Sequence, residues 1–347
     1  MQNSRDIKEC LDKLLDNNDI VFIVPHNRPD MDALGAAIGM SLICNKKGKK
    51  NYIVIDDDIE KLESSTKKVI GDISSSFDII NANDVKKLIT DKSLMIAVDV
   101  NKCNLISLET QLPNFNDIFI LDHHKTDENT IKTEYSFIDD KLSSTCEEVS
   151  RLIFLYGIKL SVDDANYLLA GIVLDTNKLN KPTINTETLS VITKLTSKGA
   201  SLYFVNNMFI EDFEHDRAIQ RLVGNTGFIN YGFAIACDND GSGKIYDVED
   251  IAKASDYLLK YQVNATFAIA HIDEQTISIS ARSKGIIDVS KIMSVFGGGG
   301  NEYSAAARIK GKSIEDIKSM LERLLIPTSN IENIISSKEN IPTLKLI

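Results

Sequence analysis

The residues best suited to chemistry in this sequence are histidines and aspartates that directly follow short apolar segments. His26, Asp30 and Asp32 fall within seven residues, immediately after the apolar run from Asp19 to Pro25. Carboxylates in front of a helix are common N-caps, so this group alone is equally consistent with a capping role. Imidazole nitrogens and carboxylates without thiolates are also the ligands that hard or borderline divalent cations prefer. The group is therefore a candidate metal site that needs support from elsewhere in the chain.

Further apolar segments end in the same kinds of side chain. Asp99 ends one of them, and His123 and His124 follow the aspartate that ends another. Asp175 closes a third, and a carboxylate buried in such surroundings needs a partner or a metal ion. Acidic residues also begin loops, but that explanation would have to apply to each segment separately. The recurrence favours one shared metal site.

A site of this composition predicts two-metal chemistry at phosphorus. Two divalent ions about 3.5 to 4 Å apart form the usual clamp for in-line phosphoryl displacement. Such ions lower the pKa of a water molecule and neutralise charge that develops on the phosphoryl oxygens. We therefore predict a phosphoesterase that cuts a phosphodiester or phosphoanhydride bond with two divalent cations, Mn²⁺ first and Mg²⁺, Fe²⁺ or Co²⁺ as alternatives. The predicted metal ligands are His26, Asp30, Asp32, Asp99, His123 and Asp175.

Alternating strands and helices must position these side chains. Continuous apolar runs of strand length suit parallel strands that are buried on both faces. Strands are predicted at 19–25, 52–55, 94–99 and 118–122, and helices at 33–46, 59–70, 144–156 and from 161 towards 175. This alternation predicts an α/β domain with a doubly wound parallel sheet. Such sheets bind ligands at the carboxyl ends of their strands, where the His and Asp residues lie.

A smaller α/β unit with a mixed sheet is predicted to follow. Its strands are expected at 228–237, 265–272 and 276–282, its helices at 248–260, 289–295 and 313–325, and a glycine run occupies 297–300. The length of 347 residues also fits two domains. The predicted division is a metal-binding catalytic domain at 1–195, a linker helix region at 196–225, a second α/β domain at 226–325 and a tail at 326–347.

Composition restricts the expected partners. A formal charge of -11 disfavours long nucleic acid, which is bound mainly through many Lys and Arg contacts to phosphate. A small phosphate ligand such as a nucleotide is therefore the expected partner. No apolar run approaches the roughly 18 residues that a membrane span needs. The N-terminus also lacks the pattern of a secretory signal, so a cytoplasmic location is expected.

The cysteines and the assembly state complete this picture. The five cysteines have no short paired spacing, which argues against a disulfide framework or a zinc knuckle. We expect all five to be reduced. The sequence leaves the oligomeric state open, with a homodimer as one option.

In order and rough spacing, the metal-binding motifs resemble those of the DHH phosphoesterases, with family II inorganic pyrophosphatases as more distant relatives. Asp122–His124 is the triplet that names the family. The second unit is similar to the DHH-associated substrate domain, through Ser280–Ser283, Phe296–Gly300 and Ala305–Ala306. The resemblance extends from Ile7 to Leu325.

Within this family, the sequence is most similar to the phosphodiesterase module of the membrane-anchored cyclic-di-AMP phosphodiesterases. Pro29–Asp32, the continuation Ala36–Gly39 and the run of four glycines carry this finer resemblance. Those relatives have transmembrane and sensory segments ahead of the module. We therefore expect this chain to be a free-standing or an excised version of it.

The resemblance implies a role for each site residue. It implies that Asp99 bridges the two ions and that His124 contacts the scissile phosphate or the leaving oxygen, which makes both catalytic. His26 and Asp30 would complete one metal site, and Asp32, His123 and Asp175 the other. The residues implied to hold the distal phosphate or the base are Arg282, Ser283, Gly298, Gly299, Gly300 and Asn301.

Three departures from the family pattern concern the substrate rather than the metals. Asn301 stands directly after the glycine run and Asn101 stands two residues after Asp99, where the family usually has His. Asn can donate and accept hydrogen bonds but cannot carry a proton or a positive charge. Lys125 and Thr126 replace two Arg of the most similar relatives, and they cannot make a bidentate guanidinium contact. We expect retained chemistry with an altered substrate preference.

The leading hypothesis is hydrolysis of a cyclic dinucleotide, cyclic di-AMP in particular, to the linear dinucleotide. A phosphoesterase for very short RNA or for phosphoadenosine phosphate is the alternative enzyme. The alternative outside the enzymes is a nucleotide sensor, in which Asn301 has weakened turnover. Pyrophosphatase activity is least favoured, because a small symmetric substrate would make little use of the second unit.

Overall fold

The computed structural model of the protein describes residues 4–56, 59, 62–209, 213–229, 232–238 and 243–325. The chain forms two compact units, Met1–Ile210 and Glu211–Ile347. The division falls inside the stretch 196–225 that was expected to connect the domains. The expected tail at 326–347 lies outside the described residues.

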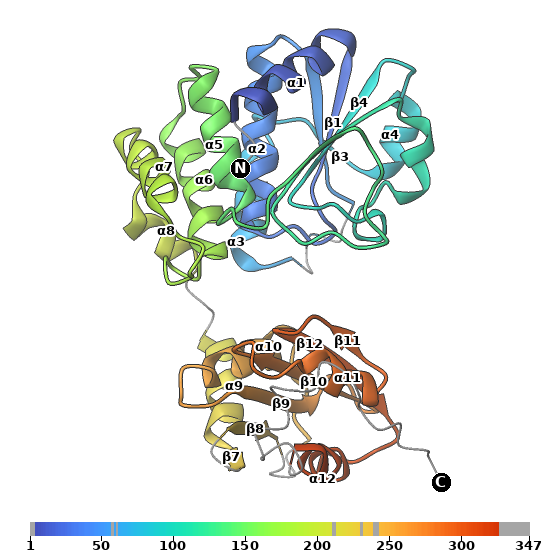
Figure 1. The fold of residues 1–347 in the computed structure, drawn as a ribbon, viewed down its shortest axis with the longest axis vertical. Helices are drawn as coiled ribbons and strands as arrows, with labels where there is room; N and C mark the ends of the chain where they lie inside the picture. The colour runs from blue at the N-terminus through green and yellow to red at the C-terminus, as the bar shows by residue number, and fades with distance from the viewer. Residues whose placement is uncertain are drawn as a thin grey trace. The chain divides into compact units, whose positions relative to one another are not determined.

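The first unit is built on a parallel sheet of six strands in the order β3-β2-β1-β4-β5-β6 (Figure 1). Every neighbouring pair in this sheet is parallel, and the order reverses direction beside β1. This confirms the predicted doubly wound α/β domain. The strands are β1 Ile20–Val24, β2 Lys50–Val54, β3 Ile79–Ile80, β4 Ser93–Val98, β5 Asp117–Asp122 and β6 Tyr135–Ile138.

Helices cover both faces of this sheet. On β1, Val21 and Ile23 pack into the core that includes α1, α2 and α5, while Phe22 and Val24 face the core that includes α4. The bounds are α1 Ser4–Asn17, α2 Met31–Lys46, α3 Ser64–Ile73, α4 Ala82–Leu88, α5 Thr145–Leu155, α6 Val162–Asp175, α7 Thr186–Ser197 and α8 Leu202–Met208, with the short 3₁₀ turns η2 Cys103–Leu105 and η3 Glu109–Asn114.

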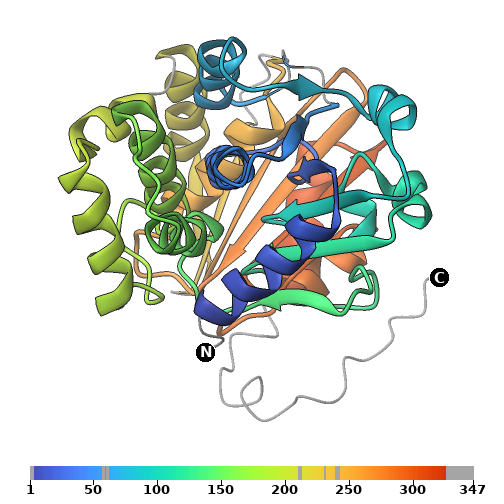
Figure 2. The same ribbon diagram turned by 90° about the horizontal axis from the view of Figure 1, so that it is seen from above.

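Helix α2 is the centre of the first unit. Nearly all its residues from Met31 to Cys44 are buried, because the sheet covers one side and α5 and α6 cover the other. The green helices α5 and α6 lie beside α2 in both views (Figures 1 and 2). This explains why the sequence of α2 is apolar all round instead of showing one apolar stripe.

The structure corrects several details of the first unit. The helix predicted at 59–70 begins only at Ser64 and continues to Ile73. The short strands β3 and β6 and the helices α1, α4 and α7 were not predicted. The 3₁₀ turns η2 and η3 join β4 to β5.

The second unit contains a mixed sheet of six strands in the order β11-β12-β10-β9-β8-β7. The pair β8–β9 is parallel and the other pairs are antiparallel. Helices α9 and α10 pack on one face, while α11 and α12 pack on the other. The bounds are α9 Phe213–Gly224, β7 Thr226–Ile229, β8 Phe233–Cys237, α10 Val248–Leu258, β9 Ala265–His271, β10 Thr276–Ser283, α11 Val289–Val295, β11 Gly299–Gly300, β12 Ser304–Lys310 and α12 Ile314–Leu325.

This arrangement confirms the predicted smaller mixed-sheet domain but changes two of its parts. The strand predicted at 228–237 is two antiparallel strands, β7 and β8. The glycine run ends in β11, which pairs with the unpredicted strand β12. Within the described part of the chain, no helix combines the length and the apolar character needed to cross a bilayer.

A substitution at Gly171 would test how closely α2 packs against α6. A Cβ at Gly171 would lie 2.7 Å from Asp32 Oδ1 and 2.5 Å from Cys146 Sγ, so Ala at this position must displace Asp32. We expect Gly171→Ala to lower the free energy of unfolding by about 1–3 kcal/mol, as overpacking of a core does. Urea unfolding monitored by circular dichroism measures this change.

Gly71→Ala is the matched control. Gly71 also lies in a helix of the first unit, but its Cβ would meet nothing within 4 Å. This substitution should leave stability unchanged or raise it by up to about 1 kcal/mol, because Ala favours helix. Equal unfolding midpoints for the two variants would show that the contact at Gly171 is not tight.

Candidate metal centre

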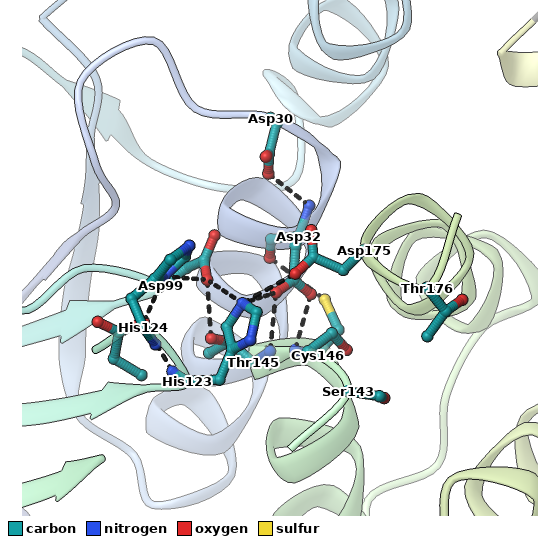
Figure 3. Close-up of polar contacts among 12 residues, drawn as sticks. Asp30, Asp32, Asp99, His123, His124, Ser143, Thr145, Cys146, Asp175 and Thr176 are labelled. Atoms are coloured by element: carbon teal, nitrogen blue, oxygen red, sulfur yellow. Dashed lines mark hydrogen bonds and ion pairs between the residues drawn. The ribbon is translucent and has the colours of Figure 1, made fainter. Parts of the chain in front are cut away.

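The predicted ligands converge at one edge of the parallel sheet. Strands β1, β4 and β5 are neighbours, and their carboxyl ends are followed by His26, Asp99 and His123. Helices deliver the remaining carboxylates, because Asp30 and Asp32 lie at the start of α2 and α6 ends in Asp175. Figure 3 shows how residues from these separate segments point toward one another. The structure thus brings together all six residues that the sequence predicted as metal ligands.

The backbone around this edge is locally strained. Asp99 has a φ of 58°, in the left-handed region that non-glycine residues seldom adopt. Among the described residues, the other non-glycine residues with positive φ are Arg28, between His26 and Asp30, and three residues at 177–179, just after Asp175. Such strain costs on the order of 1–3 kcal/mol per residue and clusters at functional sites. The strained residues therefore lie at the same edge of the sheet as the predicted metal ligands.

His26, Asp30 and Asp99 form the first of two triads. Nε2 of His26 lies 3.6 Å from Asp99 Oδ2 and 3.9 Å from Asp30 Oδ1. Nδ1 of His26 lies 2.8 Å from the carbonyl oxygen of Asn27, which can only accept a hydrogen bond. Nδ1 must therefore donate, and in the neutral ring Nε2 presents a lone pair toward two carboxylates. A cation between these groups would satisfy all of them.

Asp32, His123 and Asp175 form the second triad. Nε2 of His123 lies 2.8 Å from Asp175 Oδ2 and 3.8 Å from Asp32 Oδ2. Despite the short distance to Asp175, the nitrogen is buried and lacks a well-aligned hydrogen-bond partner in the described residues. The geometry is that of an attraction between charges rather than of a directed hydrogen bond. A buried imidazole nitrogen in this position fits a metal ligand.

Asp99 connects the two triads. Its Oδ2 faces His26 of the first triad, and its Oδ1 lies 3.3 Å from His123 Nε2 of the second. The side chain is almost completely buried. The hydroxyl of Thr145 donates a hydrogen bond to Asp99 Oδ1 at 2.9 Å, which fixes the rotation of the carboxylate. One oxygen toward each triad is the arrangement that a bridging ligand requires.

The start of α5 holds Asp32 in place, a contact that sequence reasoning missed. The backbone N–H groups of Thr145 and Cys146 donate to its two carboxylate oxygens at 2.7 and 2.9 Å. Ser144 caps the same helix by accepting a hydrogen bond from the N–H of Glu147. The sequence predicted a helix from 144, but nothing in it indicated that the first amides of this helix would meet a carboxylate from α2.

Asp30 both caps α2 and lies in the candidate metal site. Its Oδ1 accepts hydrogen bonds from the N–H groups of Asp32 and Ala33, so it is the N-cap of α2. The same side chain belongs to the first triad with His26. The capping interpretation is therefore confirmed, and the side chain also lies in the group for which a metal site was predicted.

Asp122 orients the family triplet rather than facing the site itself. Its Oδ1 accepts from the Nδ1 of His124 at 2.8 Å and from the backbone N–H groups of His123 and His124. Asn101 donates to the other oxygen of Asp122 at 2.6 Å and to the carbonyl of His124. Sequence analysis gave Asp122 no role of its own and saw Asn101 only as a departure. Both hold His124, whose ring remains more than half exposed.

The charges of this site are unbalanced without a cation. Burial and the neighbouring carboxylates raise the pKa of Asp32 and of Asp99 well above the ordinary range. Burial by itself would lower the pKa of His123, but Asp175 and Asp32 raise it to about 9. Four carboxylates thus compete for the few positive charges of the histidines. His and Asp donors without thiolates suit hard or borderline divalent cations, so the residues present fit such ions.

Arg282 and Ser283, two of the predicted substrate contacts, lie at the end of β10 in the second unit. Arg282 donates from Nε to Asp256 Oδ1 at 2.8 Å and from Nη1 to Ser280 Oγ at 3.0 Å. The hydroxyl of Ser283 is buried and accepts from the N–H of Gly285 at 3.0 Å. Arg282 is thus held in one orientation, while the hydroxyl of Ser283 shapes the following turn.

The glycine run and Asn301 form the adjoining hairpin. The N–H of Gly298 donates to the carbonyl of Met293, so this amide closes α11 instead of facing outward. A Cβ at Gly298 or Gly300 would collide with the backbone of β12, which explains two of the glycines by close approach. Asn301 accepts from the N–H groups of Tyr303 and Ser304 through its Oδ1, at 2.9 Å each. Its side chain therefore closes the turn between β11 and β12.

Comparison with known sequences identifies the family. Residues 20–186 match the DHH family, N-terminal domain, and residues 230–326 match the DHHA1 domain. The chain belongs to the DHH family. Its members are metal-dependent phosphoester hydrolases, so the predicted enzyme class is confirmed at the level of the family.

Within the DHH family, the chain is 31% identical to the cyclic-di-AMP phosphodiesterase GdpP of Bacillus subtilis, over 92% of this chain and 49% of that protein. The chain thus spans about half the length of this relative.

Solved structures show the same fold. An exopolyphosphatase-related protein of Bacteroides fragilis matches with a TM-score of 0.79 at 20% identity, covering 94% of this chain and 98% of that one. RecJ of Thermus thermophilus in complex with Mn²⁺ matches with a TM-score of 0.52 at 10% identity, covering 94% and 55%.

The unbalanced charges of the metal-free site give a pH dependence. The pKa of His123 is raised from 6.5 to about 9. The stability that protonated His123 gives the fold is therefore complete below about pH 6.5 and is lost as pH rises through 9. The raised pKa values of Asp32 and Asp99 also make the fold less stable as pH rises, because the folded state disfavours the ionised forms of these side chains. The metal-free protein should lose on the order of 3 kcal/mol of stability between pH 6.5 and 9.

Thermal unfolding with and without Mn²⁺ checks this expectation. Metal ligands must be deprotonated, so the rise in Tm on adding Mn²⁺ should be larger at pH 8.5 than at pH 6. His123→Asn should flatten the decline of the metal-free protein, whereas His271→Asn in the second unit should preserve it. A metal-free Tm that is constant between pH 6.5 and 9 would contradict the assignment.

Proposed function

We propose that this DHH-family chain hydrolyses a cyclic dinucleotide, cyclic di-AMP in particular, to the linear dinucleotide. The observation that carries the proposal is the position of Asp99, with one oxygen toward each of two His and Asp triads. The similarity to GdpP, a cyclic-di-AMP phosphodiesterase, supports the choice of substrate. The net charge of -11 supports a small nucleotide over a long nucleic acid.

Two divalent cations would occupy the triads. His26 and Asp30 would hold one, Asp32, His123 and Asp175 the other, and Asp99 would contact both. When bound, such cations lower the pKa of a water and offset charge on the phosphoryl oxygens. Mn²⁺ is the proposed ion, in keeping with the donor set and with the ion bound in the RecJ structure.

His124 would donate a proton to the leaving oxygen. Asp122 accepts from its Nδ1, which leaves Nε2 for the substrate, and the ring is accessible. The hydrogen bond with Asp122 also raises the pKa of His124, so the ring retains its proton to higher pH. A protonated Nε2 beside the scissile bond would donate that proton to the departing ribose oxygen.

The second unit would hold the part of the substrate away from the scissile bond. Arg282 is fixed by Asp256 and Ser280, so little side-chain entropy remains to be lost on binding. Its Nη2 makes no hydrogen bond to any described residue, which leaves donors for a phosphate oxygen. A guanidinium binds phosphate through a charge-assisted contact.

Asp99→Ala tests the metal assignment. Removal of the carboxylate shared by the triads should lower bound metal from two ions to one or none and reduce turnover by on the order of 10³-fold or more. Metal analysis by mass spectrometry and a rate measurement give both values. Asp72→Ala, which removes an exposed carboxylate of the same unit, should change neither. Two retained ions with full turnover in Asp99→Ala would refute the bridge.

A substrate panel tests the proposed reaction. Mn²⁺-loaded protein is offered cyclic di-AMP, cyclic di-GMP, linear diadenylate and pyrophosphate in parallel, and products are separated by chromatography. Cyclic di-AMP should be opened to the linear dinucleotide with the highest kcat/KM. Cleavage of linear dinucleotides alone would favour the short-RNA enzyme, and binding without any product would favour the sensor.

A further inference from the structure

Glu147 is a completely buried carboxylate of the first unit whose side chain has been given no role. It lies in the first turn of α5, three residues after the N-cap Ser144. In a capping box, a glutamate at this position reaches back to the backbone N–H of the N-cap residue. Here Oε2 of Glu147 accepts from the hydroxyl of Ser143 and, at 3.4 Å, from the N–H of Ser143. The side chain of Glu147 therefore joins the two ends of the segment that begins α5.

A second helix holds the same carboxylate. The hydroxyl of Thr188, in the first turn of α7, donates to Glu147 Oε2 at 3.0 Å. Arg151 donates from Nη2 to Glu147 Oε1, and the same nitrogen lies 3.1 Å from Glu187 Oε2 on α7. Both oxygens of the buried carboxylate thus accept hydrogen bonds, and its charge is paired with a guanidinium. The start of α5 is thereby fixed to the start of α7.

The turn that Glu147 fixes carries donors to the metal centre. The backbone N–H groups of Thr145 and Cys146 donate to Asp32. The hydroxyl of Thr145 donates to Asp99 (Figure 3). Both donor residues lie between the two ends of the segment that the carboxylate joins. A shift of this turn would therefore move Asp32 and Asp99 together.

This position requires an acceptor at both oxygens. The N–H of Ser143 and the guanidinium of Arg151 can only donate hydrogen bonds. They approach different oxygens of Glu147, Oε2 and Oε1 respectively. An amide in place of the carboxylate would turn its NH₂ group toward one of these two donors. Either orientation of the amide would thus release one side of the turn.

We propose that Glu147 is a positioning residue of the metal centre, which acts through the first turn of α5 on Asp32 and Asp99. The proposal rests on the proposed function in that the two triads bind divalent cations. Removal of a group that orients metal ligands typically costs about 10- to 100-fold in metal affinity. A role in packing alone would instead lower stability and leave the affinity of the folded protein for Mn²⁺ unaltered.

The test is isothermal titration calorimetry of the full chain with Mn²⁺, at a temperature where circular dichroism shows each variant to be folded. Glu147→Gln keeps the size of the side chain and should weaken Mn²⁺ binding by about tenfold or more. Thr188→Val removes the hydroxyl that α7 donates, so it should weaken binding in the same direction but less. Thr188→Ser keeps a hydroxyl and should bind as the wild type does. The pair at Thr188 decides the matter should Glu147→Gln fail to fold.

Glu148→Gln is the matched control. Glu148 is buried like its neighbour Glu147 and lies 3.3 Å from the same Arg151. In the described part of the chain, its carboxylate bonds neither Ser143 nor Thr188. Burial raises the pKa of Glu148 to about 7, so a neutral amide is a mild replacement. This variant should keep the Mn²⁺ affinity of the wild type.

The outcomes separate this proposal from the proposed function. Wild-type affinity in folded Glu147→Gln and Thr188→Val, or an equal loss in Glu148→Gln, overturns the positioning role. Absence of Mn²⁺ binding by the wild type overturns it as well. Weaker Mn²⁺ binding by Glu147→Gln in a chain that opens no dinucleotide supports the positioning role and refutes the proposed function instead.

Discussion

The first unit depends on one electrostatic constraint, which is the enclosure of Asp99 among other carboxylates in a space with little water. An isolated buried carboxylate is expensive, and like charges nearby increase the cost. The surrounding donors reduce it: Thr145 donates from its hydroxyl to Asp99, and the first amides of α5 donate to Asp32. These donors cannot neutralise the group, and the donor set around it fits divalent cations, which would.

The packing of helices serves this constraint. Asp32 occupies the first turn of α2, where a side chain on α6 at Gly171 would collide with it. The close approach of α2, α5 and α6 therefore sets how far Asp32 stands from Asp175 and His123. Gly171 thus shapes the site through its contact with Asp32, although it offers no metal-binding group itself.

Sequence reasoning selected the six predicted ligands because they follow apolar runs that are visible in the sequence, and the structure brings these side chains together. It failed for β3 and β6, since strands of two to four residues carry too little pattern to be recognised. The single strand predicted at 228–237 is in fact β7 and β8. The two were merged because apolar residues occur on both sides of the turn that separates them. The amides that hold Asp32 were also invisible, since they lie more than a hundred positions along the chain. For Asn301 the family resemblance implied a phosphate contact, and the structure adds that its side-chain oxygen closes the turn of the hairpin, which the sequence did not indicate.

The order of the strands has a consequence for biosynthesis. The central strand β1 is made early, but one of its two partners, β4, follows only after β2 and β3, and Asp175 comes from the end of α6. During translation the nascent chain therefore exposes His26, Asp30 and Asp32 long before the second triad is complete. The full set of predicted metal ligands is thus present only after the segment through α6 has been synthesised.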